Sequence, residues 1–135
     1  NVNKEGKQGQ TALMAAAQQG HVAAVKLFLR ARADPTLQSQ SNYSALDYSM
    51  KLGSVRIART LHKALRRVLR AEELRDELSM ALLGASSHGA VDIVSYLLGT
   101  DIPAALPIAA ALDIARKRGH AEIAAVLALK QQSEL

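Results

Sequence analysis

The apolar positions of this chain follow a helical period, in short runs that glycine separates two by two. Small residues at positions 12–17 predict one short helix, and apolar residues at i, i+3, i+6 and i+7 from Val22 predict the buried face of a second. Gly20 between them suits the left-handed turn that ends a helix, and the Thr11 hydroxyl can cap the first helix. Because helices this short are marginally stable alone, each is predicted to be buried against neighbours.

The same pattern returns three more times along the chain. The intervals between the central glycines of successive copies are 33, 36 and 30 residues. These glycines are Gly20, Gly53, Gly89 and Gly119. A helix–turn–helix repeated at this period predicts an all-α stack in which each helix pair covers the next. With 135 residues, the chain is predicted to form a single domain. The four predicted units are residues 1–35, 36–70, 71–101 and 102–135.

Four stretches of the sequence resemble ankyrin repeats. They are TALMAAAQQGH from Thr11, RADP from Arg32, ALDYSMKLGS from Ala45 and ALDIARKRGHAEIAAVL from Ala111. The resemblance covers nearly the whole chain and implies an ankyrin-repeat solenoid of about four helix–turn–helix units. It also implies a non-catalytic protein–protein interaction module of the scaffold or adaptor type. In such modules the projecting fingers and the first helix of each unit line a concave surface that binds a protein or peptide.

The resemblance places a set of candidate partner-binding residues on that concave surface. They are Gln18, Gln19, Tyr43, Lys51 and Leu52, with Lys7, Gln8 and Gln10 in the first finger. An exposed tyrosine beside an exposed leucine is typical of a binding hot spot. The alternative is that Tyr43 packs on the next finger and Leu52 on the adjacent helix, while the polar residues are simply solvated. The first two units are expected to contribute most, because their fingers are intact.

The middle of the chain departs from the repeat. Between Gly53 and Gly84 there is neither glycine nor proline, and apolar residues keep helical spacing throughout. The second helix of the second unit is therefore predicted to extend well past Leu65. It either ends near Arg70 or runs almost into the next helix, and the finger between these units is predicted to be missing. The turn before the fourth unit is expected to be shortened and punctuated by prolines, and the last helix is expected to end near Lys130.

A cluster of basic residues in this irregular stretch accounts for the net positive charge of the chain. Six of the 17 basic residues form a stripe with spacings of three or four, without an acidic residue among them. The stripe consists of Arg56, Arg59, Lys63, Arg66, Arg67 and Arg70. It can be a solvated helix face, or it can dock a regulatory or targeting segment on an acidic partner or an anionic surface. Nucleic acid is disfavoured, because one Phe and three Tyr provide little aromatic stacking. Glu73 is expected to pair weakly with Arg70.

The sequence contains no pattern that indicates catalysis, a metal site or a cofactor. Cysteine is absent, and the four histidines are dispersed by the repeat rather than clustered. His21 and His120 follow equivalent glycines, which indicates a structural role. Asp47 and Asp113 also occupy matching positions and are expected to be helix-start carboxylates.

The context of the chain is predicted from its ends and its composition. The first residues read as the tail of a preceding turn, and residue 1 is Asn rather than Met, so a piece of a longer protein is expected. No apolar run reaches the length of a membrane span. An intracellular, cytoplasmic protein is expected, and the sequence does not indicate an oligomeric state.

Overall fold

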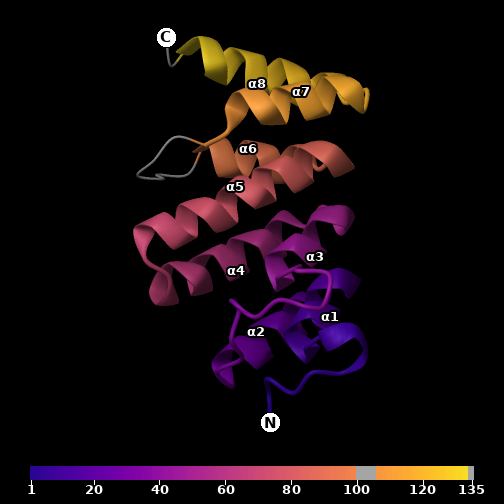
Figure 1. The fold of residues 1–135 in the computed structure, drawn as a ribbon, viewed down its shortest axis with the longest axis vertical. Coiled ribbons are helices and arrows are strands. Elements are labelled where there is room, and N and C mark those ends of the chain that lie inside the picture. The colour runs from indigo at the N-terminus through magenta and orange to yellow at the C-terminus, as the bar shows by residue number, and fades with distance from the viewer. Residues whose placement is uncertain (100–105, 134–135) are drawn as a thin grey trace.

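A computed structural model describes residues 1–99 and 106–133. In these residues eight α-helices follow one another as four antiparallel pairs, without a β-strand (Figure 1). The pairs are α1 (Ala12–Gln19) with α2 (Val22–Arg30), α3 (Ala45–Leu52) with α4 (Val55–Val68), α5 (Ala71–His88) with α6 (Val91–Gly99), and α7 (Ile108–Lys117) with α8 (Ala121–Ser133). A short 3-10 helix, η1 (Lys7–Gly9), precedes them. The predicted all-α repeat fold is confirmed.

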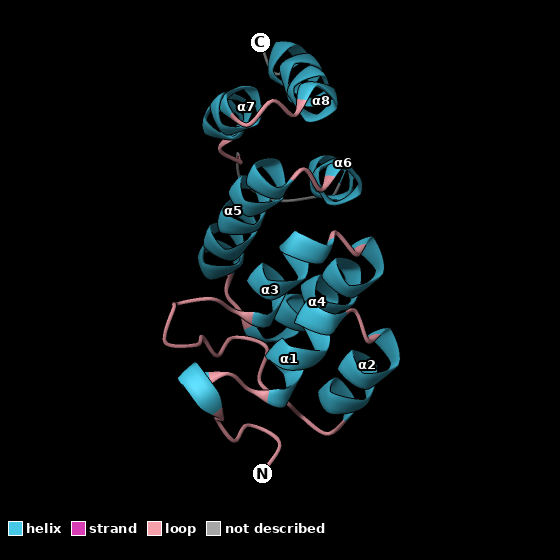
Figure 2. Cartoon of the chain, turned by 90° about the vertical axis from the view of Figure 1, so that its right-hand side faces the viewer, coloured by secondary structure: helices cyan, strands magenta, loops and turns pink. Residues whose placement is uncertain are grey.

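The helices stack in two layers. Helices α1, α3, α5 and α7 contact one another in that order, and so do α2, α4, α6 and α8, as Figure 2 shows from the side. We call the first the inner layer and the second the outer layer. Fully buried Leu13, Leu46 and Leu82 come from the inner layer, and Ile57 and Leu61 from the outer layer. The core therefore runs continuously between the layers, and each helix packs against its neighbours.

The predicted glycine turns are confirmed. All four central glycines have positive φ angles between 76° and 80°, a region that side-chain-bearing residues rarely adopt. At Gly89 there is a second constraint, because a Cβ atom there would lie 2.9 Å from Cε1 of His120. The Thr11 cap is also confirmed, since its Oγ1 accepts a hydrogen bond of 3.3 Å from the backbone N–H of Met14.

The predicted loss of the finger between the second and third units is confirmed, and so is the alternative in which the second helix of the second unit ends near Arg70. The position of the extra helix length is corrected. Helix α4 ends at Val68, and two extended residues, Leu69 and Arg70, link it to the 18-residue α5. Most of the excess length therefore belongs to the first helix of the third pair. Charge explains the break in the absence of glycine and proline. Arginines end α4 and glutamates begin α5, as the two helix dipoles favour.

Three smaller predictions are corrected. Asp113 is not a helix-start carboxylate, because α7 already begins at Ile108; its carboxylate instead pairs with Lys117 at 3.0 Å. Glu73 contacts the backbone N–H of Arg70 at 3.2 Å rather than the guanidinium. Helix α8 continues to Ser133, beyond the expected end.

The predicted short turn before the fourth unit lies mostly outside the described residues. No helix of the described residues combines the length and the apolar character that a membrane crossing requires.

Candidate interaction surface

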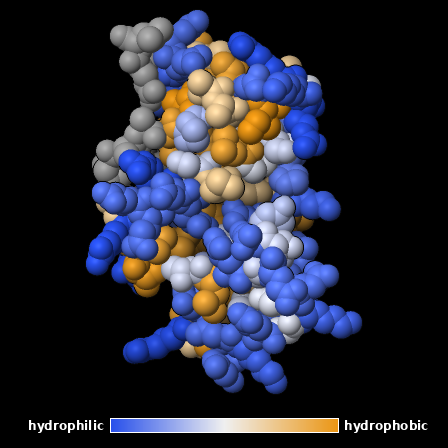
Figure 3. Space-filling model, in the orientation of Figure 1, coloured by the Kyte–Doolittle hydropathy of each residue, from blue (hydrophilic) through white to orange (hydrophobic). Residues whose placement is uncertain are grey.

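The inner layer and the second finger together form a hollow of about 990 Å³, which we call the inner groove. It is lined by Gln18 of α1, by Ser41, Asn42 and Tyr43 of the finger, by Asp47, Tyr48, Met50, Lys51 and Leu52 of α3, and by Met80, Leu83, Gly84, Ser87 and His88 of α5. Figure 3 shows the inner-layer face, on which polar side chains dominate the N-terminal half and apolar ones gather around α7. The inner groove thus draws on the first three helix pairs.

The structure brings most of the predicted partner-binding residues together. Gln18, Tyr43, Lys51 and Leu52 all line the inner groove, whereas Gln19 is exposed outside it. The Gln18 side chain is held in place, because its Oε1 accepts a hydrogen bond of 2.9 Å from Nε2 of Gln10. In the first finger Lys7 and Gln8 are exposed and do not line this groove.

Three large apolar side chains remain exposed in the inner groove. Tyr43 is 52% exposed, Leu52 54% and Met80 60%. Tyr43 packs edge-on against Tyr48, with 5.6 Å between ring centroids, and the Tyr48 hydroxyl donates a 2.9 Å hydrogen bond to Oγ of Ser39. Tyr43 is therefore accessible on one side and packed on the other against a tyrosine whose hydroxyl is hydrogen-bonded, as suits a binding anchor.

The second finger turns at a single residue, Asn42. Asn42 has a φ of 64°, a conformation that asparagine tolerates better than most residues. The backbone N–H of Gln40 also donates a 2.8 Å hydrogen bond to the carbonyl of Gln8, which ties the second finger to the first. Tyr43 follows directly after this fixed turn.

Sequence reasoning missed the contribution of α5. Met80, Leu83 and His88 reach the inner groove although the third unit was expected to contribute less. Their signal was present, because positions 80, 83, 84, 87 and 88 share one face of a helix. It was not recognised because the missing finger suggested an interrupted surface. Without that finger, the long α5 presents its own side chains beside α3.

Two carboxylates meet at the edge of this groove. The Ser44 hydroxyl contacts Oε1 of Glu77 and lies 3.2 Å from Oδ2 of Asp47, which also accepts the Ser44 backbone N–H at 3.0 Å. Burial raises the pKa of Glu77, and the nearby Asp47 raises it further, while the Ser44 hydrogen bond lowers it. Burial likewise raises the pKa of Asp47 against the hydrogen bonds from Ser44.

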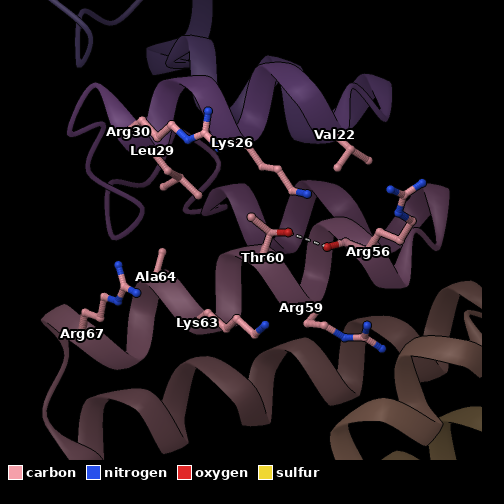
Figure 4. A pocket seen from close by; sticks show the side chains of 10 residues that line it. All are labelled: Val22, Lys26, Leu29, Arg30, Arg56, Arg59, Thr60, Lys63, Ala64 and Arg67. Atoms are coloured by element: carbon pink, nitrogen blue, oxygen red, sulfur yellow. Dashed lines mark hydrogen bonds between the residues drawn. The ribbon is translucent and has the colours of Figure 1, made fainter.

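The basic stripe is divided by the structure. Arg56, Arg59, Lys63 and Arg67 of α4 line a second hollow of about 470 Å³, which we call the outer groove (Figure 4). Its other wall is α2, with Val22, Lys26, Leu29 and Arg30, and Thr60 and Ala64 complete the lining. Arg66 lies outside the outer groove. The placement of Arg70 on the same helix was wrong, because it lies beyond the end of α4 in the cap of α5.

Two of the four histidines, His62 and His120, join neighbouring helix pairs. His120 Nε2 lies 3.0 Å from the carbonyl oxygen of Ser87, which joins the fourth pair to the third. His62 Nδ1 lies 2.7 Å from the Tyr96 hydroxyl, which joins α4 to α6. His21 is exposed. Within residues 1–99 and 106–133, no three His, Asp or Glu residues come together as a metal site would need.

Helix pairs stacked in two layers and joined by left-handed glycine turns define an α-solenoid. The family model for ankyrin repeats, in three copies, matches residues 1–70, more than half of the chain. The chain therefore belongs to the ankyrin-repeat family. No curated protein matches it. Ankyrin repeats generally mediate protein–protein interaction and are typically non-catalytic. Beyond the matched residues, α5 to α8 continue the same two layers.

Proposed function

We propose that this ankyrin-repeat array is a non-catalytic scaffold or adaptor module that binds a segment of a partner protein in the inner groove. The observation that supports it most is the convergence of Tyr43, Leu52 and Met80, from three different elements, on one hollow. Exposed apolar side chains gathered in a concavity indicate a surface that gains free energy by being covered. Single exposed apolar residues elsewhere on a protein carry no such meaning.

The lining of the inner groove defines the kind of segment that fits. Tyr43, Leu52 and Met80 provide contact area for one or two apolar side chains, and methionine adapts its shape to what it contacts. Gln18, Lys51 and Asn42 supply hydrogen-bonding groups around them. An extended peptide or a protruding loop with an apolar anchor and a polar backbone meets both requirements. A rigid flat surface would leave the hollow unfilled.

Alanine substitution in the inner groove tests this proposal. A random-peptide display library selected on the wild-type protein supplies a ligand, whose affinity is then measured by fluorescence anisotropy. Tyr43→Ala and Leu52→Ala are each expected to weaken binding by about 1–2 kcal/mol, roughly five- to thirty-fold, because each removes a hot-spot side chain. Circular dichroism at increasing temperature checks that both variants stay folded.

The chain offers a matched control for Leu52→Ala. Leu27 on α2 is 61% exposed, similar to Leu52, but lies away from the inner groove. Leu27→Ala is expected to leave the affinity of the selected peptide within about twofold of wild type. Equal losses in the Leu27 and Leu52 variants, or no loss in the Tyr43 and Leu52 variants, would contradict the choice of surface.

A further inference from the structure

The outer groove lies on the opposite layer from the inner groove and has a different chemistry. Its walls, α2 and α4, contact each other directly, and basic residues stand on both of them. Figure 4 shows Lys26 and Arg30 on α2 and Arg56, Lys63 and Arg67 on the neighbouring α4, with Leu29 and Ala64 pointing into the gap between the two helices. The hollow thus combines cations from two repeats with a small aliphatic surface.

No acidic side chain of the described residues neutralises these cations. The outer groove contains six basic residues and no Asp or Glu in its lining. Among the described residues, ion pairs within 4.0 Å join only Arg75 with Asp76 and Lys117 with Asp113, and none of these four residues lines the outer groove. Arg59 instead lies over the Tyr96 ring, 5.5 Å from its centroid. Cations that line one hollow repel one another, so a complementary negative charge is favoured there.

We propose that the outer groove binds an acidic segment of a partner protein, in which an aliphatic side chain stands among Asp and Glu residues. The carboxylates would pair with the cations of both walls, and the aliphatic side chain would cover Leu29 and Ala64. This site uses none of the residues of the inner groove, so it acts independently of the proposed function.

Shape and composition favour an acidic polypeptide over other anions. The cations line a hollow between two helices, which a narrow segment can enter and a flat membrane surface cannot. Single-stranded nucleic acids are usually held by bases stacked on aromatic rings, and no aromatic residue lines the outer groove. The aliphatic part of the lining matches a leucine or valine side chain but has no counterpart on a phosphate backbone.

Binding of a synthetic peptide tests the proposal on the full chain. The probe is a short fluorescein-labelled peptide of Glu, Asp and Leu, followed by anisotropy at physiological ionic strength. The comparison peptides replace Glu and Asp by Gln and Asn, or Leu by Gly. The acidic, leucine-containing peptide is expected to bind, the neutral peptide not to bind, and the leucine-free peptide to bind more weakly.

Charge-matched variants locate the site. Lys26→Glu with Lys63→Glu reverses one cation on each wall and is expected to weaken the acidic peptide about tenfold or more. Arg66→Glu with Arg118→Glu causes the same change in net charge outside the outer groove and is expected to stay within about twofold of wild type. Lys26→Gln with Lys63→Gln, a milder change, is expected to fall between them. Tyr43→Ala is expected to have no effect on this peptide.

Several results would overturn the proposal. Equal losses of affinity in both charge-reversal variants would show that the peptide responds to the net charge of the protein and not to the outer groove. Loss of acidic-peptide binding in Tyr43→Ala would place the peptide in the inner groove instead. Tighter, Lys26- and Lys63-dependent binding of an oligothymidine or of phosphatidylserine vesicles would assign the outer groove to another polyanion. A dissociation constant above about 1 mM for the acidic peptide would show that the outer groove is not a binding site for it.

Discussion

At the scale of single residues, the contact between Ser44, Asp47 and Glu77 shows how the finger and two repeats meet. Ser44 caps α3, Asp47 accepts its backbone N–H, and Glu77 reaches across from α5 to the same hydroxyl. A hydroxyl has a single proton to donate, so it cannot donate fully to two carboxylates at once. The arrangement is therefore least favourable when both carboxylates are ionised. Burial raises the pKa of each, and for Glu77 the nearby Asp47 raises the pKa further.

Glu77→Gln is expected to stabilise the protein at pH 7. A group with a raised folded-state pKa contributes stability at low pH, and this contribution is lost as the pH rises through that pKa. Glutamine removes the charge and keeps a hydrogen-bonding side chain, so the melting temperature at pH 7 is expected to rise by roughly 2–4 °C. The gain should shrink as the pH approaches the ordinary Glu value of 4.5, where the wild-type carboxyl is itself protonated.

Glu72→Gln is the control for this experiment, because Glu72 is exposed on the same helix. Thermal unfolding of both variants between pH 7 and pH 4 separates the local effect from the loss of one negative charge. A gain of equal size at every pH, or one that Glu72→Gln reproduces, would show that the Ser44 contact is not its source.

At the scale of elements, the break between α4 and α5 is the feature that shapes both grooves. It ends the basic wall of the outer groove at Val68 and begins the long helix that completes the inner groove. The break has no glycine or proline, so it depends on capping. The Glu73 carboxylate satisfies the Arg70 backbone N–H, one of the donors that a helix start leaves unpaired.

Glu73→Ala is expected to lower the free energy of unfolding by about 0.5–1 kcal/mol, as the loss of one capping contact does. Glu72→Ala removes an acidic residue from the same helical turn without removing that hydrogen bond, and its effect is expected to be smaller. Urea unfolding followed by circular dichroism measures both. If the two variants lose the same amount, interaction with the helix dipole alone would account for the effect.

At the scale of the whole molecule, the main contacts of each helix pair in the described residues are with its neighbouring pairs, so stability depends on the interfaces between pairs. The interface between the second and third pairs has no finger across it. The hydrogen bond between His62 and Tyr96 crosses this interface in the outer layer. Burial, reinforced by Arg66, lowers the pKa of His62, so the ring stays neutral near pH 7 and its Nδ1 can accept from the tyrosine hydroxyl.

Tyr96→Phe is expected to destabilise the protein by about 1 kcal/mol, because the buried His62 ring loses its partner. In a linear array, this weakened interface should let one side open without the other. Amide hydrogen exchange is therefore expected to accelerate in α6 and α8 more than in α1 and α2. Tyr48→Phe, which removes a hydrogen bond to Ser39 within the second unit, should not give this distribution. The same distribution in both variants would contradict a role for the interface.

The sequence by itself determined the features that depend on local chemistry. Gly20 and its three equivalents mark the turns because only glycine adopts positive φ there at little cost. Thr11 predicted a helix cap for a similarly local reason. The missing finger followed from the absence of turn residues after Leu61. The placement of Tyr43 and Leu52 followed from the ankyrin-repeat pattern.

Only the tertiary structure decided which distant residues share a surface. Met80 and His88 join Tyr43 because α5 packs against α3, and Lys26 and Lys63 line the same hollow because α2 packs against α4. A single helix carries its own stripe in the sequence, but a groove exists only between two helices. The position of the break at Leu69 was undecided for a related reason. The apolar period continues through it, and capping and charge, rather than hydrophobic pattern, set where one helix ends and the next begins.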